Sequence, residues 1–262
     1  MNILKWMASF VGVMIPAFAC GENVGFNAVV TDCGQLENVI GDNLLVIDSL
    51  SVTGPIDDTD FSTMLRGIIE GKISILNLEN AQIEDNYMSM YAFKGAKGLK
   101  KISLPHDLRY IGWGAFEDCV DLCSIGFNQG LNGIDAYTFA GCTSLKSANL
   151  CNGIRLIGEY AFINCSLDSI VIPPSVNEVG EAAFAGNQLK KIYLMPNIAP
   201  EAINRLVNCV DCDKDLFHNS TAEDIPAYVP VGASDRYRSV DGWDYLTNYI
   251  EIPIEDFPEM PN

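Results

Sequence analysis

The sequence predicts a repeat solenoid of mixed β structure with short helices, closed by a cap at each end. Three observations lead to this fold class. Phenylalanines recur every 22 or 23 residues, each repeat carries the same apolar positions, and Pro, Asn and Gly fill the gaps. A fixed period of this length indicates stacked units that share one core. The recurring residues are Phe93, Phe116, Phe139, Phe162 and Phe184.

The first element is a predicted signal peptide at residues 1–19. Lys5 is its only charged residue, residues 7–16 form a short apolar stretch, and Ala17-Phe18-Ala19 has the small-x-small pattern of a cleavage site. The apolar stretch is too short to span a bilayer. Cys20 follows directly, so lipid attachment at Cys20 and free secretion remain two alternatives. We therefore expect an exported protein, either at the cell surface or outer membrane or outside the cell.

A strand, a helix and a second strand are predicted between the signal peptide and the repeats. Residues 45–56 are apolar and β-branched and end in a Gly-Pro turn, and residues 73–78 form the second strand. Residues 60–69 predict a helix with Asp60 as its N-cap. Its predicted apolar face consists of Phe61, Leu65, Ile68 and Ile69.

The repeats occupy residues 91–197, about five copies. Each contains a short alternating segment, which predicts a strand with one buried face, and then an apolar pair at a fixed offset. One such unit has no partner for its apolar side, so units must stack, with their strands about 4.8 Å apart. The alternating segments begin at Ile102, Ile125, Ala148, Ile170 and Ile192, and the pairs are Leu108 with Ile111, Leu131 with Ile134, Ile154 with Ile157 and Val176 with Val179.

The repeat spacing is lost in residues 198–226, which we expect to be an irregular insert. Residues 227–254 then form a last structured segment, and residues 255–262 a tail.

The full motif resembles a known class of repeat. Ala-Phe-x-x-Cys-x-x-Leu-x-x-Ile-x-Leu-Pro, followed by an Ile-Gly step, is similar to the BspA-like leucine-rich repeats, which occur in surface proteins of host-associated bacteria, including the Bacteroidota, and of some protozoan parasites. The resemblance extends from Ala92 to Leu194. It implies that residues 20–90 are an N-terminal capping region and residues 227–254 a C-terminal cap, with Tyr237, Gly242 and Trp243 in its closing segment.

Composition limits the partners. The formal net charge of −18 leaves no basic footprint, so nucleic acid is excluded as a partner. An acidic surface also repels anionic lipid, so we expect membrane association only through a lipid at Cys20.

The cysteines and the acidic runs are candidates for metal or redox sites. Cys119, Cys142 and Cys165 share one repeat position, and we interpret them as small buried hydrophobic residues. For Cys209-Val210-Asp211-Cys212 with His218, a zinc site, thiol exchange, a disulfide (local or with Cys33) and free thiols all stay open. Asp57-Asp58-Thr59-Asp60 lacks the Gly and distal Glu of a calcium loop, so a helix start explains it better.

No residues match a known catalytic motif. His106, in a repeat turn, and His218 are the two histidines, and neither the phosphate-loop nor the nucleophile-elbow pattern occurs. We therefore expect no enzyme activity, no cofactor and no metal.

Two surfaces are candidates for ligand binding. The outward positions of the predicted strands form a small, polar, mixed ladder, and aromatic residues in the turns form an edge suited to protein or glycan contact. A solvated sheet face and semi-buried spacers are the alternatives. The ladder consists of Lys101, Ser103, Ser124, Gly126, Ser147, Asn149, Ser169, Val171, Lys191 and Tyr193, and the edge of Tyr110, Trp113, Tyr137 and Tyr160.

The expected function is therefore recognition without chemistry. The resemblance implies adhesion to a protein or glycan ligand, such as host matrix, by a rigid preformed surface. The alternatives are a structural or accessory envelope lipoprotein, and a glycan-binding lipoprotein of a polysaccharide uptake system.

Overall fold

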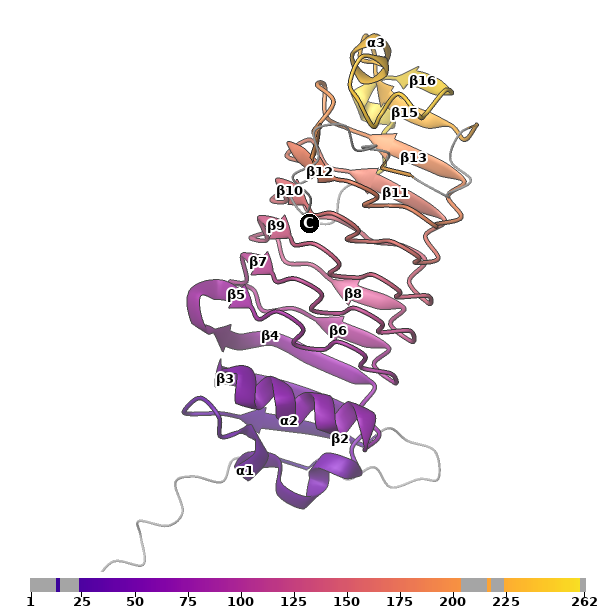
Figure 1. The fold of residues 1–262 in the computed structure, drawn as a ribbon. Coiled ribbons are helices and arrows are strands. Elements are labelled where there is room, and N and C mark those ends of the chain that lie inside the picture. The colour runs from indigo at the N-terminus through magenta and orange to yellow at the C-terminus, as the bar shows by residue number, and fades with distance from the viewer. Residues whose placement is uncertain (1–12, 15–23, 204–215, 218–223, 260–262) are drawn as a thin grey trace, which may run out of the picture.

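The computed structural model describes residues 13–14, 24–203, 216–217 and 224–259. These residues form an elongated solenoid, with helix α2 near one end and α3 at the other (Figure 1). The predicted fold class is confirmed. The signal peptide lies outside the described residues, apart from Val13 and Met14.

The first sheet joins the N-terminal cap to the repeats. All its neighbouring strands are parallel except β1 and β2, which pair antiparallel. The cap and the first two repeats therefore share one continuous ladder. In spatial order the strands are β1 (Val13–Met14), β2 (Gly25–Val29), β3 (Ser49–Ile56), β4 (Ile75–Ile83), β6 (Lys101–Ser103) and β8 (Ser124–Gly126).

A second parallel sheet lies along the other edge of the solenoid, and it was not predicted from the sequence. The second residue of each apolar pair lies on one of its strands, but most of these strands contain only two residues. Alternation is not recognisable over so short a stretch. The strands are β5 (Tyr87–Met88), β7 (Tyr110–Ile111), β9 (Gly133–Ile134), β10 (Leu156–Ile157), β12 (Glu178–Gly180) and β14 (Glu201–Ile203).

A third sheet continues the first ladder after a gap. Its four strands are parallel and in register. Between β8 and β11, the predicted strand at Ala148 is absent, although Ala148 and Leu150 are buried as the pattern requires. Ala and Asn are poor strand formers, and Ala148 stands where every other repeat carries an isoleucine. The strands are β11 (Ser169–Ile172), β13 (Lys191–Leu194), β15 (Ala227–Pro230) and β16 (Tyr249–Ile252).

The core is a stack of phenylalanine rings along the solenoid axis. Successive rings lie 5.1–5.8 Å apart, centroid to centroid, and within 21° of parallel. Every member is fully buried. The period in the sequence therefore corresponds to one ring per repeat. The stack consists of Phe93, Phe116, Phe139, Phe162, Phe184 and Phe217.

Backbone hydrogen bonds join the turns that carry these rings. Phe116 N donates to Thr138 O at 2.8 Å, and Phe139 N donates to Ala161 O at 2.8 Å in the next repeat. From Phe93 to Phe184, the residues two before and two after each phenylalanine of the stack have positive φ, which suits Gly and Asn and strains a bulkier residue. Tyrosine nevertheless occupies the first of these positions at Tyr91, Tyr137 and Tyr160.

Helix α2 (Asp58–Ile69) begins one turn earlier than predicted. Asp57, not Asp60, is the N-cap, and its carboxylate accepts hydrogen bonds from Thr59 N and Asp60 N. Asp60 is the third helical residue and is fully buried. Its carboxylate tolerates burial because it accepts hydrogen bonds from the backbone N of Gly34, Leu36 and Asp57. The helix-start interpretation of the acidic run is thus confirmed, with its register corrected.

Three further details of the cap differ from expectation. The Gly54-Pro55 step lies inside β3 rather than in a turn, next to an irregularity between Ser51 and Thr53. Residue 45 ends a 3-10 helix, η1 (Gly41–Leu45), which follows α1 (Leu36–Ile40). Ile69 is 56% exposed, and the buried face of α2 includes Met64 instead. Phe61 and Ile68 are buried as predicted, so the difference is confined to the edge of the predicted face.

The opposite end is closed around Trp243 and Tyr237. The Trp243 Nε1 donates to Pro200 O at 2.8 Å, and the Tyr237 hydroxyl donates to Pro196 O at 2.9 Å. Both side chains are fully buried. They cover the last ring of the phenylalanine stack, since Trp243 lies edge-on to Phe217 at 5.9 Å.

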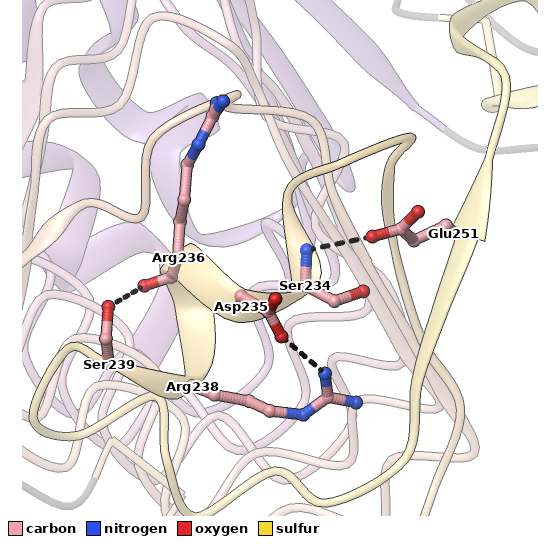
Figure 2. A network of polar contacts seen from close by, with 6 residues as sticks. All are labelled: Ser234, Asp235, Arg236, Arg238, Ser239 and Glu251. Carbon is pink, nitrogen blue, oxygen red and sulfur yellow. Dashed lines mark hydrogen bonds and ion pairs between the residues drawn. The ribbon is translucent and has the colours of Figure 1, made fainter.

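Polar contacts join helix α3 (Ser234–Arg238) to β16 and also connect residues within the helix (Figure 2). Ser234 N donates to Glu251 Oε1 at 3.3 Å, and Arg238 Nη1 pairs with Asp235 Oδ1 at 3.4 Å. Hydrogen bonds from the backbone of Gly232, and then from Ser234, lower the pKa of the Glu251 carboxyl. The remaining 3-10 helices are η2 (Glu84–Asn86) and η3 (Ile254–Asp256).

Candidate ligand-binding faces

The outward side of β6 and β8 is small and polar, as predicted. Lys101 lies opposite Ser124, and Ser103 lies opposite Gly126. Lys101, Ser124 and Gly126 are exposed, and Ser103 is half-buried. Beyond β8, Ser147 and Asn149 are exposed as well, but they lie in the gap between the two sheets rather than on a strand.

The outward side of the third sheet is apolar instead. Val171, Tyr193, Tyr228 and Ile250 lie opposite one another on four successive strands, and we refer to them as the apolar stripe. The Tyr193 and Tyr228 rings stack at 4.9 Å. The first three side chains are half-buried and Ile250 is 36% exposed. The predicted ladder is mixed, and its two larger apolar members, Val171 and Tyr193, lie at this end of the face.

Polar groups border the apolar stripe. Lys191 Nζ lies 5.4 Å from the Tyr193 ring centroid, and half-buried Ser169 lies opposite Lys191. On the other side, the buried Phe257 ring packs edge-on against Tyr193 at 6.2 Å. Sequence reasoning missed Tyr228 and Ile250 because the insert at residues 198–226 breaks the repeat period before them.

Three of the four predicted edge aromatics form a stack. The Trp113 and Tyr137 rings are 5.6 Å apart and the Tyr137 and Tyr160 rings 4.9 Å apart, and all three are half-buried. The Tyr160 hydroxyl donates to Glu181 Oε1 at 3.1 Å. Burial first, and then the Glu181 charge, raises the pKa of the Tyr160 hydroxyl to about 12.

Tyr110 does not belong to this stack. It lies on β7, is 44% exposed, and its ring covers Gly133, where an added Cβ would be 2.9 Å from Tyr110 Cδ1. The four aromatic residues therefore form two separate surfaces.

The repeated cysteines are buried, which confirms their interpretation as small core residues. The Sγ atoms of Cys119, Cys142 and Cys165 each donate to a phenylalanine carbonyl of the preceding repeat, at 3.0–3.2 Å. They are free thiols. Burial raises the pKa of the Cys119 and Cys165 thiols to about 12, and it also raises that of Cys142.

Some predicted sites lie outside the described residues, namely Cys20, Cys209, Cys212 and His218. Among residues that the structure does describe, no three His, Cys, Asp or Glu side chains converge as metal ligands. His106 is exposed, and Cys33 is an exposed free thiol. In the same described ranges, no helix is long and apolar enough to cross a membrane.

Comparison with known proteins identifies the repeats. The description "BspA type Leucine rich repeat region" matches residues 73–190 in six copies. Residues 73–190 are a leucine-rich repeat region of the BspA type. The matched region begins at residue 73, two residues before strand β4, whereas the repeats were expected from residue 91. No curated protein matches the chain.

Solved structures share the fold at low sequence identity. The pneumococcal vaccine antigen PcpA is 17% identical, with a TM-score of 0.53, and the match covers 79% of this chain and 59% of that one. A leucine-rich repeat protein from Eubacterium ventriosum is 19% identical, with a TM-score of 0.50, covering 79% and 55%. The T. pallidum leucine-rich repeat protein TpLRR is 21% identical, with a TM-score of 0.43, covering 81% and 82%. This chain therefore spans a little over half the length of the first two.

Proposed function

We propose that the protein is a non-catalytic recognition protein, exported to the surface or secreted, that binds a protein ligand through the outward strand face. The apolar stripe carries this proposal. Partly exposed tyrosines bordered by polar residues are the usual anchors of protein interfaces.

Rigidity supports the proposal. Parallel strands in register fix the outward positions at one strand spacing, so little conformational entropy is lost when a ligand docks. Lys101, Ser124 and Lys191 extend the same face as a polar rim. Tyr193 and Tyr228 would supply most of the binding free energy, and the small polar positions would exclude water and set the register.

The proposed location, at the cell surface or outside the cell, has support of its own. The predicted signal peptide at residues 1–19 indicates export, and the repeats share their fold with PcpA, which is described as a pneumococcal vaccine antigen.

A glycan ligand is less well supported at the aromatic edge. Sugars pack against the open faces of aromatic rings. In the stack of Trp113, Tyr137 and Tyr160 the rings cover one another, so Tyr137 has a neighbouring ring on both faces. We therefore place the principal binding face on the strands.

The test is binding of the chain from Gly21 onward to immobilised host matrix proteins and glycans at physiological salt. We expect saturable binding to one protein, and a loss of at least about tenfold in affinity for the double variant Tyr193→Ser/Tyr228→Ser. The control is Tyr91→Asn, since Tyr91 is an exposed tyrosine in a turn away from the strand face and Asn tolerates its positive φ.

Two outcomes would contradict the proposal. One is equal loss of binding in both variants. The other is no binding to any member of the panel, which would favour the envelope-component alternative. Lipid on Cys20, measured by mass spectrometry of the membrane fraction, would then be the next question.

A further inference from the structure

A groove opens between the N-terminal cap and the second sheet, away from the strand face. Its volume is about 670 Å³, within the range of ligand-binding clefts. The floor is apolar and buried, formed by Ile56, Phe61 and Ile83. The proposed function does not use this groove.

Two tyrosines form one wall and are held in place. Tyr87 and Tyr110 lie opposite each other on β5 and β7, and they are 36% and 44% exposed. The Tyr87 hydroxyl hydrogen-bonds to Asp135 Oδ2 at 3.4 Å, while the Tyr110 ring covers Gly133. The Tyr87 ring lies over Gly112 and the Tyr110 ring over Gly133, so each ring can present its outer surface to the groove without moving.

Four carboxylates form the rest of the lining, at Asp57, Asp58, Glu84 and Asp85. Asp57 caps α2, and Asp58 accepts a hydrogen bond from Ser89 Oγ. Glu84 and Asp85 are exposed. Within the described part of the chain, no Lys, Arg or His lines the groove.

Arg109, the neighbour of Tyr110 in the sequence, directs its side chain elsewhere. Arg109 N donates to Asn86 O at 2.8 Å, which fixes the turn carrying Glu84 and Asp85, but the Arg109 Nη1 donates to Gly130 O at 3.1 Å. Its charge is therefore held toward the next repeat. The groove combines apolar walls with uncompensated negative charge.

We propose that this groove binds an arginine side chain on an exposed segment of a partner protein. A guanidinium group stacks on a tyrosine ring and donates to two carboxylate oxygens at once, so it fits both features of the lining. A neutral sugar would leave the four negative charges uncompensated. The volume accommodates the arginine together with one or two flanking residues.

The probe is a fluorescent hexa-arginine peptide, titrated against the chain from Gly21 onward at about 0.05 M and about 0.15 M salt. We expect saturable binding that weakens at the higher salt concentration. The double variant Glu84→Gln/Asp85→Asn should lose about tenfold or more in affinity, and Tyr110→Leu should lose a smaller factor. Asn tolerates the positive φ of Asp85, so the fold is kept.

Controls separate this site from general attraction to an acidic protein. Asp241→Asn removes an exposed charge in the C-terminal cap and should bind the peptide as the parent chain does. Tyr193→Ser/Tyr228→Ser should also bind normally, because it alters only the strand face.

Equal losses in Asp241→Asn and Glu84→Gln/Asp85→Asn would overturn the proposal, as would an unchanged affinity in Tyr110→Leu. Binding of hexa-lysine as tight as that of hexa-arginine would also overturn it, because the arginine-specific geometry would then be unused. A neutral oligosaccharide that displaces the peptide would replace arginine with a glycan as the occupant.

Discussion

The residue three positions after Phe116, Phe139, Phe162 and Phe184 satisfies a carbonyl of the preceding repeat. Cys119, Cys142 and Cys165 do this through a thiol, and Asn187 does it through an amide. The sequence made the cysteine burial predictable, because one residue type at one repeat position points to one environment. The role of Asn187 was not predictable, since asparagine is more often exposed.

Buried thiols should make stability depend on pH in alkaline solution. The ordinary thiol pKa is 9.0, and folding raises it to about 12 at Cys119 and Cys165. Folding favours the protonated thiol, so its contribution is complete below pH 9.0 and is lost as pH rises toward 12. In urea unfolding, Cys119→Ala/Cys165→Ala should lose less stability between these pH values than the parent chain. An equal loss would contradict this assignment.

Asn187 should matter more than its position in a turn suggests. Its Nδ2 donates to the carbonyls of Phe162, Phe184 and Ala185, and its Oδ1 accepts from Leu167 N. Asn187→Ala should cost about 2–4 kcal/mol of unfolding free energy, because several buried backbone groups lose their partner.

Asn187→Cys is the informative comparison. It restores the bond to Phe162 but not the Asn187 contacts of Phe184 O, Ala185 O and Leu167 N, so we expect a smaller cost than for Asn187→Ala. The same urea midpoints measure both variants, and an Asn187→Cys variant no more stable than Asn187→Ala would contradict the equivalence of the two side chains.

At the scale of elements, the strand gap at Ala148 should be a local weak point. The strands on either side, β8 and β11, belong to two different sheets. In hydrogen exchange followed by mass spectrometry, the amides of residues 147–149 should exchange faster than those of Ile125 and Ile170. Protection equal to that of the neighbouring strands would show that the ladder is continuous in solution.

Elements were predictable where the pattern is long and local. The strands β6, β8, β11 and β13 follow from alternation over several residues. The two-residue strands of the second sheet carry no such signal. The groove was hidden for another reason, because its lining comes from α2, η2 and β7, and only the stacking of the cap on the repeats brings these together.

At the scale of the whole molecule, the phenylalanine stack should couple the two ends. Phe139 is fully buried and has a ring on each side. Phe139→Ala should cost about 3–5 kcal/mol and weaken the interfaces between its repeat and both neighbours. We expect the two halves of the solenoid to unfold separately in this variant.

Two tryptophans at different ends allow this to be measured. In the chain from Gly21 onward, which lacks Trp6, Trp113 reports on the early repeats and Trp243 on the C-terminal cap, so each can be followed alone after the other is replaced by Phe. Their urea midpoints should coincide in the parent chain and separate in Phe139→Ala. Phe257→Ala, outside the stack, is the control, and coinciding midpoints in Phe139→Ala would show that coupling does not depend on the rings.

The ladders have a mechanical consequence. The two caps lie at opposite ends of the solenoid (Figure 1), and the hydrogen bonds between repeats run along its axis. A pulling force between the ends would load these bonds one rung at a time, so strands would peel off in sequence. Each repeat that detaches would extend from about 4.8 Å along the solenoid axis to about 75 Å of unfolded chain. A cell attached to its ligand through this protein would have a tether that extends stepwise under tension and shortens again when the tension falls.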